Sequence, residues 1–487
     1  MLLGGLDIGT TGCKLTVYDD QGRWITNAYR EYEISRSCGR HEIDAGLIWD
    51  SVCQVIKETA QKAPELAAIG VTSFGETFVM LDERDQILAP SMIYTDPRGE
   101  EEISCLKEII PESRLIQITG ARPHHTYSLG KIMWMKEHQR ELYQRTKRIL
   151  LMADFIVYRL SGAAVIDDSL AARTAAFDIR RRCFSEEIIQ AAGIDPSLLS
   201  TPVPSGSLAG NMKENLQKAF GFSGSVKIII AGQDQISAAV GAGVLEPGDT
   251  VDGTGTVECI TPVFQEIPQD PAFYQHNYSV IPFVFPDTYV CYAYSYTGGA
   301  AIKWFRDTFR EGTGYEVLNR SLPGQPTGIL VLPHFAGAAT PYMDNGSKAA
   351  ILGITLETGL GDLYQAIMEG VTYEMRLNTE LLSRFGIRPK CFRATGGGAK
   401  SEEWLQIKAD ILKTPITALD AMEAGACGSC MMAGVTLGLY SDYHQAKQFF
   451  VREKKTFLPN PSKQQTYEEI YQRYRQLYQT VRPLINN

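Results

Sequence analysis

The chain has 487 residues, which exceeds the length at which a single hydrophobic core stops growing, so two domains are expected. Apolar residues make up 44% and charged residues 21%, as is ordinary for a globular protein. The formal net charge of −9 argues against nucleic acid or an acidic membrane as the main partner, because both usually require a basic face.

The first residues, MLLGGLDIGTTG, are apolar but lack a basic leading segment, and Asp7 interrupts them. We therefore interpret them as a buried strand and not as a signal peptide. No apolar run approaches the roughly 18 residues that would span a bilayer. The ten cysteines are scattered, which is typical of reduced, mostly buried thiols. These features predict a cytoplasmic protein.

Strands and turns alternate at the start of the chain. Apolar runs predict strands over 3–8, over 13–18 and from residue 24 onward, separated by glycine-containing turns. Apolar residues at helical spacing predict a helix over 48–60, and strands return at 67–73 and 78–81. This order indicates a mixed α/β domain.

A second segment of the same kind lies near the middle of the chain. A β-branched run over 226–231 ends in Gly232-Gln233-Asp234-Gln235, and Asp249–Thr256 then resembles the opening Asp7–Gly12. The similarity predicts two related halves. We place the domain boundary at 245/246, giving domains 1–245 and 246–487, and expect a closing surface helix from about residue 463.

Two turns rich in glycine and threonine follow acidic residues, Asp7 in the first half and Asp252 in the second. Such turns point backbone N–H groups and hydroxyls at one spot, where phosphate oxygens can be held. Asp7, on the strand leading in, would be placed to hold Mg²⁺ through a water. Either turn alone could be an ordinary hairpin turn, whereas the pair suggests phosphates held from both sides of a cleft.

A third glycine-rich segment, Thr395–Ser401, precedes an expected helix over 404–412. Glycines at a strand-to-helix junction let a base or a phosphate approach the backbone closely, although a tight turn explains them equally well. The segment is not the GxGxxG fingerprint, and no GxxxxGK[ST] P-loop occurs in the chain. A nucleotide site would then have to be built from hairpins.

With these segments in this order, the chain resembles the FGGY family of carbohydrate kinases, within the actin-like and hexokinase-like ATPases, over nearly its whole length. Segment 349–369 fits one family signature at every constrained position, and segment 126–138 fits the second except at its first residue. The likeness is to the L-fuculose-kinase-like and xylulose-kinase-like branch. It implies two α/β domains of the actin/hexokinase-like (ribonuclease H-like) type flanking a deep cleft. The sugar and the catalytic base would lie in the N-terminal domain and the nucleotide in the C-terminal domain.

The resemblance also implies roles for single residues. Asp234 matches the catalytic base that deprotonates the accepting hydroxyl, and Asp7 matches the acid near Mg²⁺. The expected sugar-binding residues are Gly75, Glu76, Asp96, Thr126, Asp234 and Gln235. The expected ATP-binding residues are Thr10, Thr11, Thr254, Gly255, Gly299, Lys303, Gly397, Gly398 and Ser401. ATP and Mg²⁺ are the expected cofactors. The expected partner is a small-molecule sugar, with no nucleic acid and no membrane, and a homodimer is left open.

The expected sugar pocket departs from two branches of the family. Where this chain has Gly75-Glu76, glycerol kinases carry Arg-Glu and xylulose kinases typically Met-His, so the guanidinium that partners the glutamate in glycerol kinases is missing at that position. The aromatic residue that packs on glycerol aligns with Thr126, and Tyr127 is next to it. Asp96, with Arg98 two residues on, could bind sugar hydroxyls or form an ion pair that braces its loop. These differences suggest a pocket roomier than glycerol needs.

The residues leave several functions open. The main interpretation is a kinase that phosphorylates a ketose or polyol, with a glycerol-kinase-like enzyme as its variant. A non-catalytic sugar or nucleotide sensor on the same fold and an actin-like ATPase are the alternatives. Cys427 and Cys430 have CxxC spacing, but the small residues around them favour core packing over a metal site. Trp304 and Trp404 fall at helical positions and are predicted to lie in the core.

Overall fold

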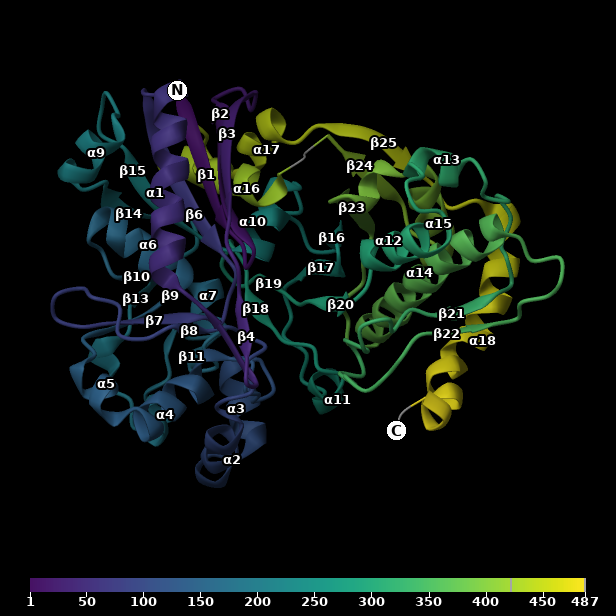
Figure 1. Ribbon diagram of the computed structural model, residues 1–487, viewed down its shortest axis with the longest axis horizontal. Helices are drawn as coiled ribbons and strands as arrows, with labels where there is room; N and C mark the ends of the chain where they lie inside the picture. The colour runs from purple at the N-terminus through teal and green to yellow at the C-terminus, as the bar shows by residue number, and fades with distance from the viewer. Residues whose placement is uncertain (421–422, 486–487) are drawn as a thin grey trace. The chain divides into compact units, whose positions relative to one another are not determined.

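The computed structural model describes residues 1–420 and 423–485. The chain divides into two compact units, drawn in Figure 1. Unit 1 consists of Met1–Leu245, Ser279–Tyr289 and Glu423–Val451, and unit 2 of the described residues of 246–278, 290–422 and 452–487. Both units combine a sheet with helices, which confirms the predicted two-domain α/β architecture.

The sheet of unit 1 has six strands in the order β14-β15-β6-β1-β2-β3. Strand β1 pairs antiparallel with β2 and parallel with β6, and β6 pairs parallel with β15. The central strands are buried almost continuously, as expected for strands covered on both faces. The strands are β1 (Leu2–Ile8), β2 (Gly12–Asp19), β3 (Trp24–Glu31), β6 (Leu66–Ser73), β14 (Ser207–Asn211) and β15 (Lys227–Gln233).

Helix α1 illustrates how the sequence pattern becomes structure in unit 1. The side chain of Asp44 caps its first turn, with Oδ1 accepting from the backbone N–H of Gly46 at 2.7 Å. The predicted apolar face, including Ile48, Val52 and Ile56, is fully buried. The helices of unit 1 are α1 (Ala45–Lys62), α2 (Glu100–Ile109), α3 (Glu112–Thr119), α4 (Ser128–His138), α5 (Arg140–Arg145), α6 (Met152–Ser161), α7 (Asp168–Ala172), α8 (Glu186–Ala192), α9 (Glu214–Phe220), α10 (Asp234–Gly241), α16 (Ala424–Thr436) and α17 (Tyr443–Phe450).

Three parallel strands of unit 1 end at the same edge of the sheet. In the strand register, Asp7 lies opposite Thr72, and Gln233 lies opposite Ser73. The residues that follow β6 and β15 therefore emerge beside the end of β1. Ligands of open α/β sheets bind outside the carboxyl ends of the strands, so this edge is where a site is expected.

Helix α16 packs directly on this sheet because glycines leave no side chain in the way. A Cβ atom on Gly5 would lie 2.0 Å from the carbonyl oxygen of Ala426, and one on Gly70 would lie 2.4 Å from that of Ser429. On its other side, a Cβ on Gly428 would lie 1.8 Å from the carbonyl oxygen of Ser237 in α10. The α10–α16 contact is thus a contact between backbones.

Cys427 and Cys430 lie in this packed segment of α16. Both side chains are buried, and both thiols are free. Burial raises the pKa of the Cys427 thiol to about 12, which keeps it protonated and unreactive. The CxxC spacing here reflects helix packing, as the small neighbouring residues suggest.

Replacing Gly428 by alanine is expected to destabilise unit 1 by about 1–3 kcal/mol, because the new methyl group meets a backbone oxygen that cannot rotate away. Urea unfolding followed by circular dichroism measures the change. Gly224→Ala is the matched control, since a Cβ there meets no atom within 4 Å. Equal midpoints for the two variants would contradict the backbone contact.

The sheet of unit 2 repeats the strand pairing of unit 1. Strand β16 pairs antiparallel with β17 and parallel with β23, and β23 pairs parallel with β24. Its strands include β16 (Asp249–Thr254), β17 (Glu258–Phe264), β20 (Ala293–Ser295), β23 (Cys391–Thr395), β24 (Ile416–Leu419) and β25 (Glu453–Phe457). Its helices are α11 (Pro271–Gln275), α12 (Gly299–Phe309), α13 (Tyr315–Asn319), α14 (Leu360–Arg384), α15 (Glu402–Leu412) and α18 (Pro461–Ile485).

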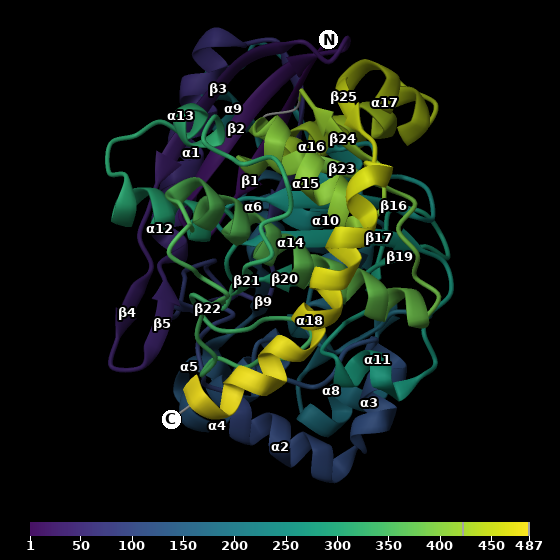
Figure 2. The same ribbon diagram turned by 90° about the vertical axis from the view of Figure 1, so that its right-hand side faces the viewer.

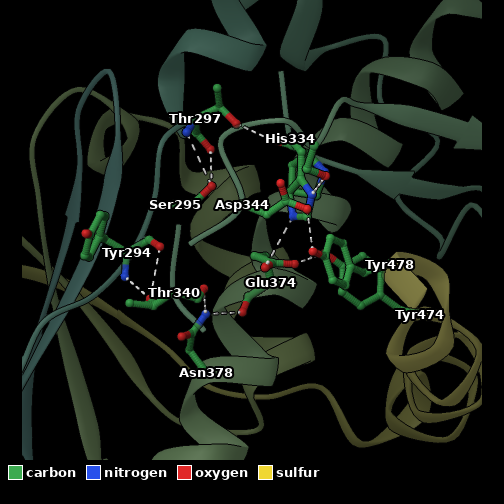
Figure 3. Close-up of polar contacts among 12 residues, drawn as sticks. Tyr294, Ser295, Thr297, His334, Thr340, Asp344, Glu374, Asn378, Tyr474 and Tyr478 are labelled. Carbon is green, nitrogen blue, oxygen red and sulfur yellow. Dashed lines mark hydrogen bonds and ion pairs between the residues drawn. The ribbon is translucent and has the colours of Figure 1, made fainter. Parts of the chain in front are cut away.

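The predicted closing helix, α18, is seen in yellow in Figure 2 and buries a tyrosine-rich face in unit 2. Figure 3 shows part of the polar network beneath it: Tyr474 donates to Glu374 of α14, and Tyr478 donates to Asp344 at 2.7 Å. His334 lies within 3.5 Å of Glu374 and bonds Ser347 at 2.8 Å. The hydroxyl groups thus satisfy buried carboxylates, and α18 is both a covering helix and a polar clamp.

In the part of the chain that the structure describes, no helix combines the length and the apolar content that crossing a membrane requires.

Candidate active site

Asp234 is the first residue of α10, directly after β15 at the shared strand edge of unit 1. Its Oδ1 accepts from the backbone N–H of Gln235 at 2.7 Å. The pKa of Asp234 is raised to about 7, first by burial and then by the carboxylate of Asp7 and, less strongly, by that of Glu76. The Gln235 N–H and the Arg173 guanidinium act in the opposite direction. The carboxylates of Asp7 and Glu76 are therefore close enough to Asp234 to act on its charge.

Asp7 lies one residue before the end of β1. Burial and the nearby carboxylate of Glu423 raise its pKa to about 6, against the lowering effect of Lys14. Lys14 and Glu423 form an ion pair of 2.6 Å. A Cβ on Gly425 would lie 2.8 Å from Oδ2 of Asp7, so the glycine makes room for the carboxylate. Lys14, Glu423 and Gly425 were not predicted as site residues, although Lys14 lies two residues after the first expected phosphate turn.

The first expected phosphate turn joins β1 to β2. It is closed by a hydrogen bond from the N–H of Gly9 to the carbonyl oxygen of Gly12 at 2.9 Å. Within it, Thr10 is half-buried and Thr11 is exposed. Both threonines are thus accessible at the edge that also carries Asp7.

Glu76 sits in a tight turn after β6 with its backbone in the left-handed region, at φ 65°. This conformation is uncommon for a residue with a side chain and persists only where its surroundings fix it. Here the Ser128 hydroxyl donates to the Glu76 carbonyl oxygen at 2.8 Å, and the N–H of Thr77 donates to the Gly75 carbonyl oxygen at 2.8 Å. Gly75 and Glu76 are both buried.

The cationic partner that is missing at position 75 is supplied from elsewhere in unit 1. Arg173, which follows α7, pairs with the carboxylate of Glu76, although 97 residues separate them. The Arg173 guanidinium also lies 4.9 Å from the centre of the Tyr127 ring, a cation–π distance. Sequence reasoning missed Arg173 because nothing in the local pattern around it points to Glu76.

Asp96 braces its loop. Its side chain has no exposed surface, and it accepts from the N–H of His41 at 2.8 Å and from the Arg98 guanidinium at 2.7 Å. Arg98 also pairs with Glu42 at 2.6 Å. The structure thus shows the ion pair that braces the loop, and binding of sugar hydroxyls by Asp96 stays a prediction. Thr126 is half-buried and donates its hydroxyl to the carbonyl oxygen of Tyr94 at 3.3 Å.

Three expected nucleotide segments converge in unit 2. The N–H of Gly299, at the start of α12, donates to the Gly255 carbonyl oxygen at 2.8 Å. A Cβ on Gly396 would lie 2.6 Å from the carbonyl oxygen of Thr254, and one on Gly398 would lie 2.5 Å from its Cγ2. The glycines are therefore required for this close approach of the backbones. Around Gly397 there is open space, since an added Cβ would meet nothing within 4 Å.

Two other expected nucleotide-binding residues, Lys303 and Ser401, differ in their surroundings. Lys303 is exposed on α12, one turn after Gly299 and on the same face of the helix. Ser401 is the N-cap of α15: its Oγ accepts from the N–H of Trp404 at 3.2 Å and from Nδ2 of Asn319 at 3.0 Å. The hydroxyl of Ser401 thus has a structural role. Trp404 is buried as predicted, whereas the prediction for Trp304 was wrong, because 38% of that residue is exposed.

A buried lysine underlies the second phosphate turn. The Nζ atom of Lys408, on α15, contacts Asp252 at 2.7 Å, Thr254 at 2.5 Å and Glu258 at 2.9 Å. All four residues are about 1% exposed. Burial, together with the Asp252 carboxylate, raises the pKa of Glu258 against the lowering effect of Lys408. The ammonium group joins the two strands that flank the turn and uses its three donors to do so.

The two sites together define a class of protein. Unit 1 gathers three carboxylates and a glycine-threonine turn at one strand edge, and unit 2 gathers glycine-rich turns around Thr254. A carboxylate with a pKa near 7, together with turns of the kind that hold phosphate groups, is typical of a phosphotransferase.

Comparison with known proteins identifies the family. The N-terminal and C-terminal domain models of the FGGY family of carbohydrate kinases match residues 2–241 and 252–437, so the chain belongs to this family. The xylulose kinase of Lactococcus lactis subsp. lactis (strain IL1403) is 27% identical over 98% of this chain and 96% of the relative. The chain is accordingly a carbohydrate kinase, a phosphotransferase that uses ATP to phosphorylate a sugar hydroxyl.

Solved structures agree on the fold. A ligand-bound xylulose kinase from Lactobacillus acidophilus has a TM-score of 0.90 at 23% identity, with 99% of this chain and 98% of that chain covered. A gluconate kinase from the same organism has a TM-score of 0.89 at 22% identity, with the same coverage. The fold is thus shared by kinases that are named after different substrates, xylulose and gluconate.

Proposed function

We propose that the enzyme transfers the γ-phosphoryl group of ATP to a hydroxyl of a ketose or polyol, with a xylulose-like ketose as the first candidate acceptor. The observation that carries the proposal is the Asp234 carboxylate, whose pKa of about 7 suits a base that works near neutral pH. The xylulose kinases among the relatives support the ketose. Gly75-Glu76 in place of Met-His leaves open which ketose it is.

In the proposed reaction, Asp234 accepts the proton of the acceptor hydroxyl. The hydroxyl oxygen forms a bond to the γ-phosphorus while the bond from that phosphorus to the β,γ-bridging oxygen breaks, and ADP leaves. Phosphoryl transfer depends mainly on alignment and on neutralising charge. We assign these tasks to the turns at Thr10-Thr11 and Thr254-Gly255. In the first turn, the accessible hydroxyl groups of Thr10 and Thr11 would hold phosphate oxygens.

Asp7 fits the role of holding Mg²⁺. Magnesium in phosphotransferases is usually held by one or two carboxylates together with substrate phosphates and water, so a full protein cage is not needed. Among residues 1–420 and 423–485, no group of three or more His, Cys, Asp or Glu side chains forms such a cage. The Asp7 carboxylate, with a pKa raised to about 6, is mostly ionised at neutral pH and lies at the strand edge. When bound, the ion would neutralise phosphate charge.

The cellular setting is proposed from the thiols. All ten cysteines are free, which suits a reducing compartment such as the cytoplasm.

The test of the function is ADP release with and without a panel of acceptors that includes D-xylulose, L-ribulose, L-fuculose, glycerol and gluconate. We expect ADP release that depends on a ketose or polyol. Release that is independent of any acceptor would indicate an ATPase. Binding of sugar without any turnover would indicate a sensor.

The rate should depend on pH in a definite direction. Asp234 must be deprotonated to accept a proton, so kcat/KM for the acceptor is expected to fall by about tenfold for each pH unit below its pKa. The raised value places the onset of this loss near pH 7 and not near pH 4. Initial rates across the acidic and neutral range at saturating ATP measure it. A rate that stays constant well below pH 7 would exclude Asp234 as the base.

A further inference from the structure

Arg173 is a largely buried cation of unit 1 to which the proposed reaction gives no role. It caps the C-terminus of α7, and its side chain is only 12% exposed. Both Nε and Nη2 contact the same carboxylate oxygen of Glu76, and the guanidinium lies over the Tyr127 ring. Arg173 therefore joins Glu76 of the expected acceptor pocket to Tyr127, the neighbour of Thr126, and it also lowers the pKa of Asp234.

The turn at Gly75-Glu76 is shaped around this arginine. A Cβ on Gly75 would lie 3.3 Å from Cγ of Arg173 and 3.3 Å from Nε2 of Gln233, so a larger residue there would press on the arginine stem. The Glu76 backbone is held by Ser128 in a conformation that is costly for a residue with a side chain. Main chain and side chain of Glu76 are thus fixed independently, by Ser128 and by Arg173.

The charges around the pocket follow from these contacts. Asp7, Glu76 and Asp234 contribute carboxylates, and the charge of Arg173 is matched by Glu76. Lys131 is fully buried, and its Nζ is directed at the carbonyl oxygens of His125 and Thr126. Burial lowers the pKa of His124 to about 4 and also lowers that of His125, so both rings are neutral at pH 7. Arg36 lies on the exposed side, near Tyr94.

We propose that Arg173 is a positioning residue that determines acceptor specificity. By holding Glu76 and Tyr127 it fixes the carboxylate that binds the acceptor hydroxyls. Because its charge is neutralised by Glu76, the pocket selects uncharged ketoses and polyols over sugar acids such as gluconate. A carboxylate on the acceptor would meet the carboxylates of Glu76 and Asp234, while the guanidinium of Arg173 is already paired with Glu76. This inference rests on the proposed function.

The first experiment replaces Arg173 by methionine and by lysine. The methionine variant should raise the acceptor KM by at least about tenfold, because Glu76, a residue of the acceptor pocket, loses its ion-pair partner. The KM for ATP should change by less than about twofold, since Glu76 is not an expected ATP-binding residue. Its acid pH limb should move upward, since the arginine favours ionised Asp234. Lysine, or methylguanidinium added to the methionine variant, should restore part of the acceptor affinity. Arg140→Met, on the 73% exposed side chain of α5, is the matched control.

The second experiment compares acceptors. In the wild type, kcat/KM for the best ketose should exceed that for gluconate by at least about a hundredfold. Glu76→Gln removes the partner charge of Arg173 and keeps the side-chain shape, so the gluconate-to-ketose ratio should rise by at least about tenfold. The double variant with Arg173→Met should lose this gain.

Several results would overturn the inference. The first is a wild-type enzyme that uses gluconate as well as ketoses. The second is an Arg173→Met variant whose acceptor KM and acid pH limb are unchanged. The third is an Arg173→Met variant that loses acceptor affinity, ATP affinity and melting temperature alike and regains none of them with lysine or methylguanidinium. If no acceptor supports ADP release, the proposed function fails instead. Calorimetric binding of ketoses against gluconate then still decides whether the pocket discriminates by charge.

Discussion

Asp234→Asn is expected to lower kcat by about 10²- to 10⁴-fold while ATP still binds with unchanged affinity. The amide cannot accept the proton of the attacking hydroxyl, but it keeps the shape of the side chain at the start of α10. The carbonyl of the amide can still accept from the N–H of Gln235, so the local backbone should hold. Steady-state assays of ADP release, together with fluorescent-nucleotide binding, measure both quantities.

The control for Asp234 is the same substitution at an exposed aspartate of the same unit. Asp50 lies on the exposed side of α1, and Asp50→Asn should leave kcat unchanged. The pH dependence gives a second check, because the acid limb assigned to Asp234 should vanish from the residual rate of the variant. Full activity of Asp234→Asn, or an unchanged acid limb, would refute the proposed mechanism.

Lys408→Met is expected to destabilise unit 2 by about 3–5 kcal/mol, because it leaves the buried Asp252 and Glu258 without their cation. Methionine matches the length of the lysine stem, so the loss should come from the charge and not from a cavity. Thr254 would lose its hydrogen bond from Nζ as well, and the phosphate turn should loosen. Chemical unfolding measures the stability, and the KM for ATP reports on the turn.

Lys218→Met is the matched control for Lys408. Lys218 forms an exposed ion pair with Glu214 in α9, and such pairs contribute about 0–1 kcal/mol. If both lysine variants unfold at the same denaturant concentration, the buried ammonium group does not stabilise the turn. Burial raises the pKa of Glu258, so its unpaired carboxylate can become neutral as the pH falls. The loss of stability caused by Lys408→Met should therefore be smaller at low pH.

Features encoded by neighbouring residues could be predicted from the sequence. The strands β1, β2, β6 and β7 (Phe78–Leu81) and the apolar face of α1 follow from local alternation and helical spacing. Asp7 could be singled out because it stands at a strand end beside a glycine-rich turn, whereas the role of Asp234 was implied by the resemblance to the FGGY family. The structure adds the physical reason why the two residues lie near each other: the parallel strands that precede them end at the same edge of the sheet.

Features that depend on distant pairing could not be predicted. Arg173 contacts Glu76 across 97 residues, and Lys408 contacts Asp252 across 156. A basic residue with helical neighbours is usually solvated, so its sequence context gives no sign of burial. The structural contacts of Ser401 and Asp96 could not be predicted either: Ser401 caps its own helix, and Asp96 pairs with Arg98 in its own loop.

The position of α16 in the chain has a consequence for biosynthesis. The sheet that carries Asp7 and Asp234 at its edge is built from the first 245 residues. The helix that packs on this sheet, α16, is formed only by Ala424–Thr436. A ribosome must therefore complete nearly the whole polypeptide before unit 1 can close, and glycines 5 and 70 stay uncovered until then. Contacts of such long sequence separation slow folding and leave apolar surface open to chaperones. A fragment cut at residue 245 would lack the helix that packs on its sheet, so we expect that residues 1–245 alone do not form a stable domain.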